Sequence, residues 1–235
     1  MFESKYNKVL TVILVIVIIA IVTLLGFLTY DYIYKFSNTK QASDFVEDYQ
    51  GNMDSIDENV IENETENIIE NVVENVTLDN TNEVPIEGSG SSSSGTSNKQ
   101  DYKGFTVVGT MRIPAINFEY PIFEEVTGPA LEVGVVALYP SGDNLNLPGN
   151  TVVIGHNYRN GMFFSNLKKL SNGAKIYVKD YRGKTLTYEV YNKFETSQSD
   201  TSFYDRDTNG LAELTLSTCT DASNDQRTII FAKQI

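Results

Sequence analysis

The most hydrophobic part of the chain lies near its N-terminus. Residues 9–28 (VLTVILVIVIIAIVTLLGFL) contain no charged residue, and only Thr11, Thr23 and Gly26 depart from strong hydrophobicity. A helix of this length spans about 30 Å, which is the thickness of the hydrocarbon core of a bilayer. A cleaved signal peptide would have a shorter apolar region, followed by small residues at a cleavage site. A tyrosine-rich sequence follows instead, so we predict an uncleaved transmembrane signal anchor over residues 9–28.

Charged residues on the two sides of this segment predict its orientation. Lys5 and Lys8 precede it, whereas acidic residues dominate the longer stretch after Lys35 and Lys40. The positive-inside rule therefore places the N-terminus in the cytoplasm and the rest of the chain outside. We expect a single-pass protein of the cell membrane, in which residues 1–35 form a cytoplasmic stub and the anchor.

Residues 36–101 have the composition of an extracellular spacer. They carry 2 Lys and 15 acidic residues, which accounts for the net charge of −13 of the whole chain. Branched aliphatics recur near helical spacing from Ile61 to Val76, so an amphipathic or coiled-coil stalk is one interpretation. We favour a disordered, solvated and self-repelling acidic stalk, because Asn is abundant and a poor helix former. Gly88 to Asn98 (GSGSSSSGTSN) is typical of a flexible linker.

From Phe105 onward the pattern changes to short runs of β-branched and aromatic residues separated by turn sequences. Alternation between two faces is clearest in TLTYEVY, which begins at Thr185. Only residues 163–170 have the pattern of a short helix. The predicted strands are 105–113, 118–123, 133–139, 151–156, 175–179, 185–194, 211–218 and 227–233. So many short strands within residues 102–235 predict an all-β domain that forms a closed or nearly closed β-barrel.

Composition removes several classes of function. The net charge of −13 argues against a nucleic-acid partner, because nucleic-acid phosphates require clustered Lys and Arg. Within residues 102–235, 13 basic and 14 acidic residues nearly balance. One Cys and one His exclude a disulfide framework within the chain and leave too few ligands for a zinc site. Acids in loops, such as Glu124, Glu125, Asp143 and Asp180, lack the spacing of calcium ligands. The sequence therefore predicts neither a metal nor another cofactor.

The sole histidine and the sole cysteine each end an apolar strand. His156 closes TVVIGH, Cys219 closes LTLSTC, and Arg227 opens the strand after a polar stretch. If the last two strands form a hairpin, Cys219 and Arg227 stand side by side. Taken alone, each has an ordinary interpretation as a surface imidazole, a small buried side chain or an edge charge. Together they offer a nucleophilic thiol, an imidazole to assist it and a cation for an oxyanion, as cysteine-based acyl transfer requires.

Several motifs resemble one family, the sortases, which are membrane-anchored cysteine transpeptidases of Gram-positive bacteria. The nucleophile motif TLxTC of that family is matched by Thr215 to Cys219, and the family Arg follows eight residues later as Arg227. The resemblance covers about residues 106–233 and keeps the family order of His, Cys and Arg. The matching stretches are IPAI at 113–116, VIGHN at 153–157, LTLSTC at 214–219 and RTII at 227–230.

The resemblance implies a closed eight-stranded sortase barrel with one or two short helices, and a two-step acyl transfer. Cys219 would attack a carbonyl in a sorting signal such as LPxTG, near the C-terminus of a secreted protein. His156 would protonate the departing amine, and Arg227 would hold the substrate carbonyl and the oxyanion. An amine of a cell-wall precursor, or a Lys of a pilin subunit, would then accept the acyl group. Ser217 and Thr218 would bind substrate, with Thr218 the better candidate for a hydrogen bond.

The subclass and two rival functions follow from the same features. Residues 195–212 are too few for the helical insertion of class B sortases, and residues 88–112 lack the DP-aromatic lid motif of class C. We therefore expect a class D-like or class A-like enzyme, with class B less favoured.

Two rival functions are compatible with the same sequence. One rival is a cysteine hydrolase on the same barrel, with water as the acceptor. The other is a tethered, non-enzymatic β-barrel binding module in which Cys219 is structural.

Overall fold

A computed structural model describes residues 2–74, 99–140 and 144–235 of the chain. It divides into two compact units, Met1–Gln41 and Ala42–Ile235, which are described separately. The helix α1, Phe2–Glu74, belongs to both. The predicted division at residues 35 and 101 stays a prediction, although packed structure begins at Ala42, well before residue 102.

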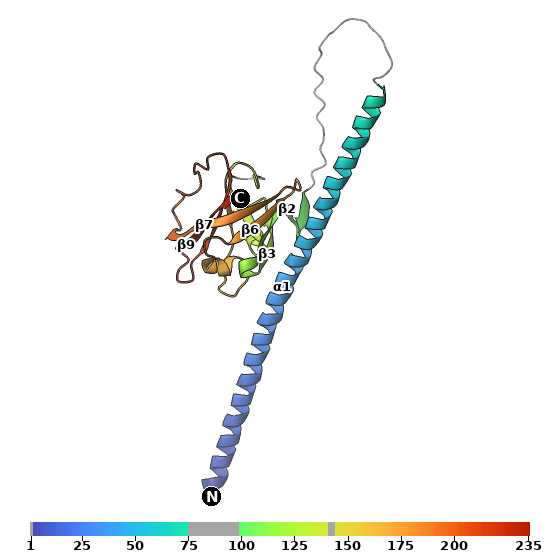
Figure 1. The fold of residues 1–235 in the computed structure, drawn as a ribbon. Helices are drawn as coiled ribbons and strands as arrows, with labels where there is room; N and C mark the ends of the chain where they lie inside the picture. Colours follow the sequence, from blue (N-terminus) through green and yellow to red (C-terminus); the bar gives the residue numbers. More distant parts are fainter. Residues whose placement is uncertain (1, 75–98, 141–143) are drawn as a thin grey trace, which may run out of the picture. The chain divides into compact units, whose positions relative to one another are not determined.

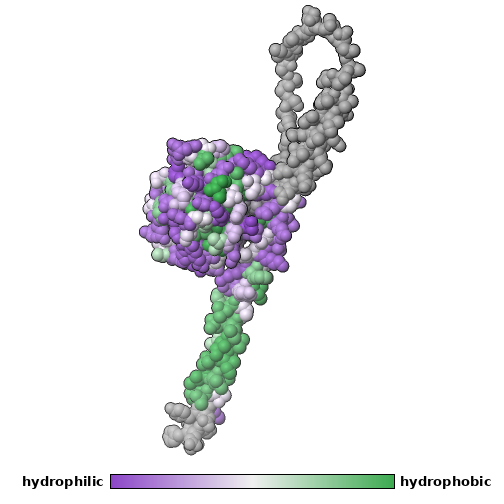
Figure 2. Space-filling model, in the orientation of Figure 1, coloured by the Kyte–Doolittle hydropathy of each residue, from purple (hydrophilic) through white to green (hydrophobic). Residues whose placement is uncertain are grey.

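The N-terminal unit is the apolar part of α1. Within the described residues, one helical stretch, Lys8–Asn52, is long and apolar enough to cross a membrane. None of its most apolar window is buried inside the protein, and its mean hydropathy is 3.3. Figure 2 shows that the apolar surface is continuous over the N-terminal part of this stretch, which contains residues 9–28. The exposure of so many large apolar side chains, such as Ile13, Val22 and Phe27, agrees with a segment that has lipid as its surroundings.

The prediction of a disordered stalk is wrong for residues 36–74, which continue α1 as a helix. The physical reason is that helix formation is limited by nucleation, and the preceding apolar segment already supplies a long helix to extend. The remainder of the predicted stalk and the flexible linker, residues 75–98, lie outside the described residues.

A short part of α1 packs on the barrel within the C-terminal unit. Ala42, Val46 and Tyr49 are at most 1% exposed, and they lie at the spacing of one helix face. The rings of Phe45 and Tyr102 are in contact, 4.7 Å apart between centroids and tilted by 43°, which joins this face to the first strand of the barrel sheet. The acids between these positions, Asp44, Glu47 and Asp48, are exposed.

The described residues of the C-terminal unit form a nine-stranded sheet, of which eight strands close into a barrel. The order around the barrel is β2-β3-β4-β5-β8-β9-β7-β6. The barrel closes where β6 pairs with β2, and Figure 1 labels both strands. The bounds are β2 Phe105–Ile113, β3 Phe118–Phe123, β4 Val135–Tyr139, β5 Gly149–Ile154, β6 Lys175–Asp180, β7 Thr185–Ser197, β8 Ala212–Cys219 and β9 Gln226–Gln234. The predicted closed eight-stranded barrel is therefore confirmed, and β1, Gln100–Tyr102, adds an outer strand to β2.

Within the part of the barrel domain that the structure describes, three short helices connect the strands. The helix predicted over residues 163–170 is the 3-10 helix η2, Phe164–Lys169. Sequence reasoning missed the 3-10 helix η1, Pro114–Ile116, and the one-turn helix α2, Gly128–Leu131. The side chain of Thr127 caps α2 by accepting a hydrogen bond from the Ala130 amide.

The barrel is filled by alternate side chains of its strands, so its interior is a packed core and not a channel. Fully buried members from five different strands are Met111, Ile122, Val153, Leu216 and Ile230. Because both β5 and β8 are lined by such residues, their C-terminal ends are held firmly next to each other.

Candidate active site

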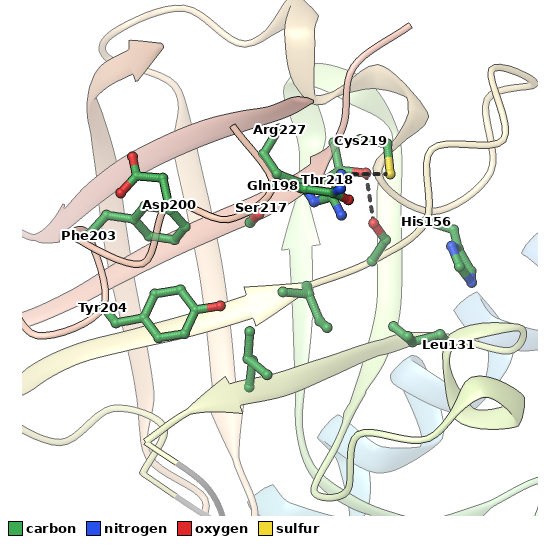
Figure 3. A pocket seen from close by; sticks show the side chains of 13 residues that line it. Leu131, His156, Gln198, Asp200, Phe203, Tyr204, Ser217, Thr218, Cys219 and Arg227 are labelled. Atoms are coloured by element: carbon green, nitrogen blue, oxygen red, sulfur yellow. Dashed lines mark hydrogen bonds between the residues drawn. The ribbon is translucent and has the colours of Figure 1, made fainter. Parts of the chain in front are cut away.

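The parallel pairing of β5 with β8 brings the predicted His and Cys to the same end of the barrel. Ile154 is the register partner of Ser217, so His156 and Cys219 each follow two residues after this aligned pair. Both line one pocket of about 260 Å³. The structure therefore brings these two strand ends to one pocket (Figure 3).

The β8–β9 hairpin brings Arg227 to the cysteine, as its spacing predicts. Cys219 and Arg227 are register partners, and Nη1 of Arg227 lies 3.3 Å from the Cys219 sulfur. The same Nη1 donates to the carbonyl oxygen of Asn224 at 2.6 Å. The thiol is partly exposed. A guanidinium in this place stabilises a thiolate and can also donate to an oxyanion that forms on a bound carbonyl.

Close packing fixes the backbone just before the histidine. A Cβ at Gly155 would lie 2.7 Å from Val135 and 2.9 Å from Phe164, so the position has room for glycine alone. The buried Thr218 hydroxyl donates to the Gly155 carbonyl at 2.7 Å, which ties β8 to this point. Tight packing and this hydrogen bond together define where His156 leaves the barrel.

The two residues predicted to bind substrate, Ser217 and Thr218, both line the pocket. Both are nearly buried, at 6% and 4% exposed. Because the Thr218 proton is donated to Gly155, the free capacity of this hydroxyl toward a ligand is that of an acceptor. Their roles in substrate binding stay predictions.

The imidazole of His156 stands at the rim of the pocket and apart from the Cys219 sulfur (Figure 3). Its Nε2 lies 3.6 Å from Oε1 of Glu132, the residue that follows α2. The Tyr158 hydroxyl donates to the other oxygen of Glu132, and its ring stacks on the imidazole at 4.9 Å between centroids. Glu132 and Tyr158 thus hold the imidazole from two sides. Sequence reasoning missed both.

The opposite wall of the pocket is the loop between β7 and β8. Its contributing residues are Gln198, Asp200, Phe203 and Tyr204. Burial raises the pKa of Tyr204 above its ordinary value, and the Arg227 guanidinium opposes part of this shift. The phenol is therefore uncharged at neutral pH and offers a hydroxyl to the pocket beside largely apolar surface.

An ionic and hydrogen-bonded network holds the loop between β7 and β8 that forms this wall. Arg206 pairs with Glu213 at 2.8 Å and donates to the Tyr191 hydroxyl at 2.7 Å and to Asn150 at 2.9 Å. The Asn150 amide in turn donates to the backbone carbonyls of Phe203, at 3.0 Å, and of its neighbour. The loop is thereby joined to β5 and β8 through hydrogen bonds that the sequence gives no sign of.

The loop acids that lack calcium spacing have other partners. Glu124 accepts from Lys99 at 2.9 Å, and the fully buried Asp180 pairs with Arg182 at 2.9 Å. Asp143 lies outside the described residues. Among the residues whose placement the structure describes, no group of three or more His, Cys, Asp or Glu side chains is placed to hold a metal ion.

The fold and site define a closed β-barrel that gathers a thiol, a guanidinium and an imidazole around one pocket. Comparison with known proteins places this arrangement in a family. A family model described as the sortase domain matches residues 111–235. Because this match covers more than half of the chain, the protein belongs to the sortase family.

Individual relatives agree with this membership. Sortase A of Streptococcus agalactiae serotype III is 29% identical over 131 residues, covering 54% of this chain and 52% of that protein. Sortase A of Bacillus anthracis is 26% identical over 127 residues, covering 54% of this chain and 58% of that protein. The chain spans little more than half the length of these curated relatives.

Solved structures resemble the barrel as well. Sortase A from Corynebacterium diphtheriae superposes with a TM-score of 0.51 at 30% identity, covering 56% of this chain and 61% of that chain. Sortase C-1 from Actinomyces oris gives a TM-score of 0.51 at 27% identity, covering 55% of this chain and 74% of that chain.

Proposed function

We propose that this protein is a cysteine transpeptidase that cleaves a sorting signal and transfers the acyl group to an amine. The observation that carries the proposal is the contact between Arg227 and the Cys219 sulfur, at 3.3 Å, in a pocket that His156 also lines. A structural cysteine would have no need of a guanidinium on an exposed side of its sulfur. Membership of the sortase family supports the same chemistry.

In the first step the Cys219 thiolate attacks the carbonyl carbon of the scissile amide. Arg227 donates to the oxyanion, and the tetrahedral intermediate collapses to a thioester as the C–N bond breaks. The leaving nitrogen takes its proton from the His156 imidazolium. Since the imidazole stands apart from the sulfur, the leaving nitrogen lies between the two groups in this mechanism (Figure 3).

In the second step an acceptor amine attacks the thioester and gives a proton to His156. A new amide forms, and the Cys219 thiolate leaves. The substrate is a secreted protein with an LPxTG-like signal, and the acceptor is an amine of the cell wall or of a pilin Lys. The names of the Sortase A relatives support a class A-like enzyme. A class D-like enzyme is the alternative, because the segment of residues 195–212 is short.

The apolar stretch of α1 supports the location that we propose. This stretch anchors the chain in the cell membrane as a single span, with the N-terminus in the cytoplasm and the barrel outside. This topology places the site where secreted proteins and cell-wall precursors meet.

The test is mass spectrometry of the full-length chain in detergent micelles, incubated with sorting-signal peptides and then with oligoglycine. We expect a thioester adduct on Cys219 and a ligated peptide, both absent from Cys219→Ala. A hydrolase would release free acid without a ligated product at any amine concentration. A binding module would form no adduct at all. Either outcome would overturn the proposal.

A further inference from the structure

Two loops that carry the site lie against each other. The first follows β5 and contains His156, and the second joins β8 to β9 between Cys219 and Arg227. The Asn157 amide donates to the Cys219 carbonyl at 2.9 Å and to Oδ1 of Asp221 at 2.9 Å. Its own oxygen accepts from the Arg159 amide at 3.0 Å. Asn157 is only 9% exposed, so its side chain is fully engaged between the loops.

Arg159 reaches across to the same loop. Its Nε donates to the Asp221 carbonyl at 2.8 Å, and its Nη2 donates to the Thr220 carbonyl and to Oδ1 of Asn224, both at 3.1 Å. The backbone of Arg159 has φ of 56°, in the left-handed region that non-glycine residues seldom adopt. The hydrogen bond from its amide to Asn157 helps to hold this conformation.

The far end of this connection is the catalytic guanidinium. Asn224, whose side chain receives Arg159, accepts from Nη1 of Arg227 through its backbone carbonyl at 2.6 Å. The same Nη1 lies 3.3 Å from the Cys219 sulfur. Asn224 therefore links the two arginines: its side chain binds Arg159, and its backbone carbonyl binds Arg227. An ion pair between Lys168 of η2 and Asp221 closes the assembly.

We propose that Asn157 and Arg159, termed here the loop clamp, are positioning residues of the active site. Asn157 fixes the backbone of Cys219, and Arg159 fixes Asn224 and through it Arg227. The sulfur and the guanidinium keep their separation because the histidine loop holds both. This role rests on the proposed transpeptidase function.

The test compares Arg159→Met with Lys169→Met in the full-length chain in detergent micelles. Lys169 lies in the neighbouring 3-10 helix and lines the same surface hollow as Arg159. Its substitution by Met therefore removes one positive charge from this surface and leaves the hydrogen bonds of Arg159 intact. We expect Arg159→Met to lower kcat by about 10- to 100-fold with KM changed less than twofold, because small displacements of reacting groups have effects of this size. Lys169→Met should stay near wild type. Equal kcat values in the two variants would overturn the proposal.

A double-mutant cycle separates positioning from other effects. If Arg159 acts through Arg227, Arg159→Met should add little to the loss already caused by Arg227→Lys. Full additivity would show that Arg159 works independently, which contradicts the relay. Asn157→Ala is the second variant, and it should lower kcat in the same way even with Arg227→Lys present, since it acts on Cys219.

A measurement without substrate keeps this proposal distinct from the function itself. Cys219 is the sole cysteine, so the rate of alkylation by iodoacetamide at pH 7 reports one thiol. We expect Arg159→Met to slow alkylation several-fold relative to Lys169→Met. If wild type transfers no peptide, the proposed function fails while alkylation still tests the clamp. An unchanged alkylation rate in Arg159→Met would contradict the clamp even in an active transpeptidase.

Discussion

Cys219 and Arg227 face each other across the β8–β9 hairpin, and one guanidinium nitrogen lies 3.3 Å from the sulfur. The pairing register brings the two residues together, because antiparallel partners on one face of a hairpin place their side chains within reach of each other. The Arg227 guanidinium can therefore donate to a Cys219 thiolate and also to a substrate oxyanion that forms beside it.

Arg227→Lys keeps the charge but loses the planar fork, so the ammonium cannot serve sulfur and oxyanion with the same geometry. We expect acylation to slow by about 10²–10³-fold, the usual loss for one oriented oxyanion donor, with KM changed much less. Single-turnover kinetics with a sorting-signal peptide measure this directly. Arg112→Lys, at an exposed position of β2, is the matched control. A variant with unchanged acylation and only a raised KM would show that Arg227 binds substrate and does not stabilise the transition state.

Glu132→Ala removes the carboxylate that faces Nε2 of His156 at 3.6 Å and accepts from Tyr158. The imidazole then loses one of its two supports, so we expect kcat to fall by about three- to tenfold. His156→Ala should lose far more, about 10²–10⁴-fold, because it removes the proton donor itself. Glu132→Gln retains an acceptor and should recover part of the rate. Steady-state kinetics rank the variants, with the exposed Glu125→Ala as control. Equal rates for Glu132→Ala and Glu125→Ala would refute a role for this carboxylate.

The strands and the hairpin of the site were predictable because they depend on local patterns. The bounds of β2 and β3 match the predicted 105–113 and 118–123, since alternation and turn residues mark both ends. The distance along the chain from Cys219 to Arg227 fits a hairpin, and β8 and β9 form one. For the same reason the closed barrel could be inferred without a structure.

The hydrogen bonds that hold the site in place could not be predicted, because they join residues far apart in the sequence. Asn157 and Cys219 are 62 positions apart, and Arg206 and Asn150 are 56 apart. Nothing in one sequence marks such pairs. The packed part of α1 is a different case: Ala42, Val46 and Tyr49 have helical spacing, but the excess of acids around them favoured a solvated spacer.

Arg206→Met breaks the buried pair with Glu213, whose side chains are only 16% and 11% exposed. The largely buried Glu213 carboxylate then loses its cation and keeps the hydrogen bond from the Tyr191 hydroxyl. Loss of one partner of a buried ion pair costs about 3–5 kcal/mol. Urea unfolding of the full-length chain in detergent should show this loss, and the exposed Arg112→Met should show little. The double variant Arg206→Met with Glu213→Leu should be less destabilised than the sum of its single variants. Simple additivity would mean that the pair contributes nothing as a unit.

The last prediction concerns the contact of α1 with the barrel. Tyr49 is fully buried beside Phe45 and near Tyr102, so Tyr49→Ala should destabilise the C-terminal unit by about 3–5 kcal/mol, as expected for a large aromatic side chain. Tyr49→Phe should behave differently. The Tyr49 hydroxyl is buried with no hydrogen-bond partner among the described residues, and burial raises its pKa. Removing an unpaired hydroxyl is neutral or stabilising by about 1 kcal/mol.

Urea unfolding of the full-length chain in detergent again provides the measurement. Glu47→Ala, on the exposed face of the same turn, is the control for helix propensity. A wild-type stability for Tyr49→Ala would mean that α1 does not pack on the barrel in solution. In that event residues 36–101 would act as a spacer, helical or not, and a chain that begins near residue 99 should be as stable as the whole. If Tyr49→Ala is destabilised, the same truncation must lose stability too, because it removes every α1 side chain that covers Tyr102 and Phe123.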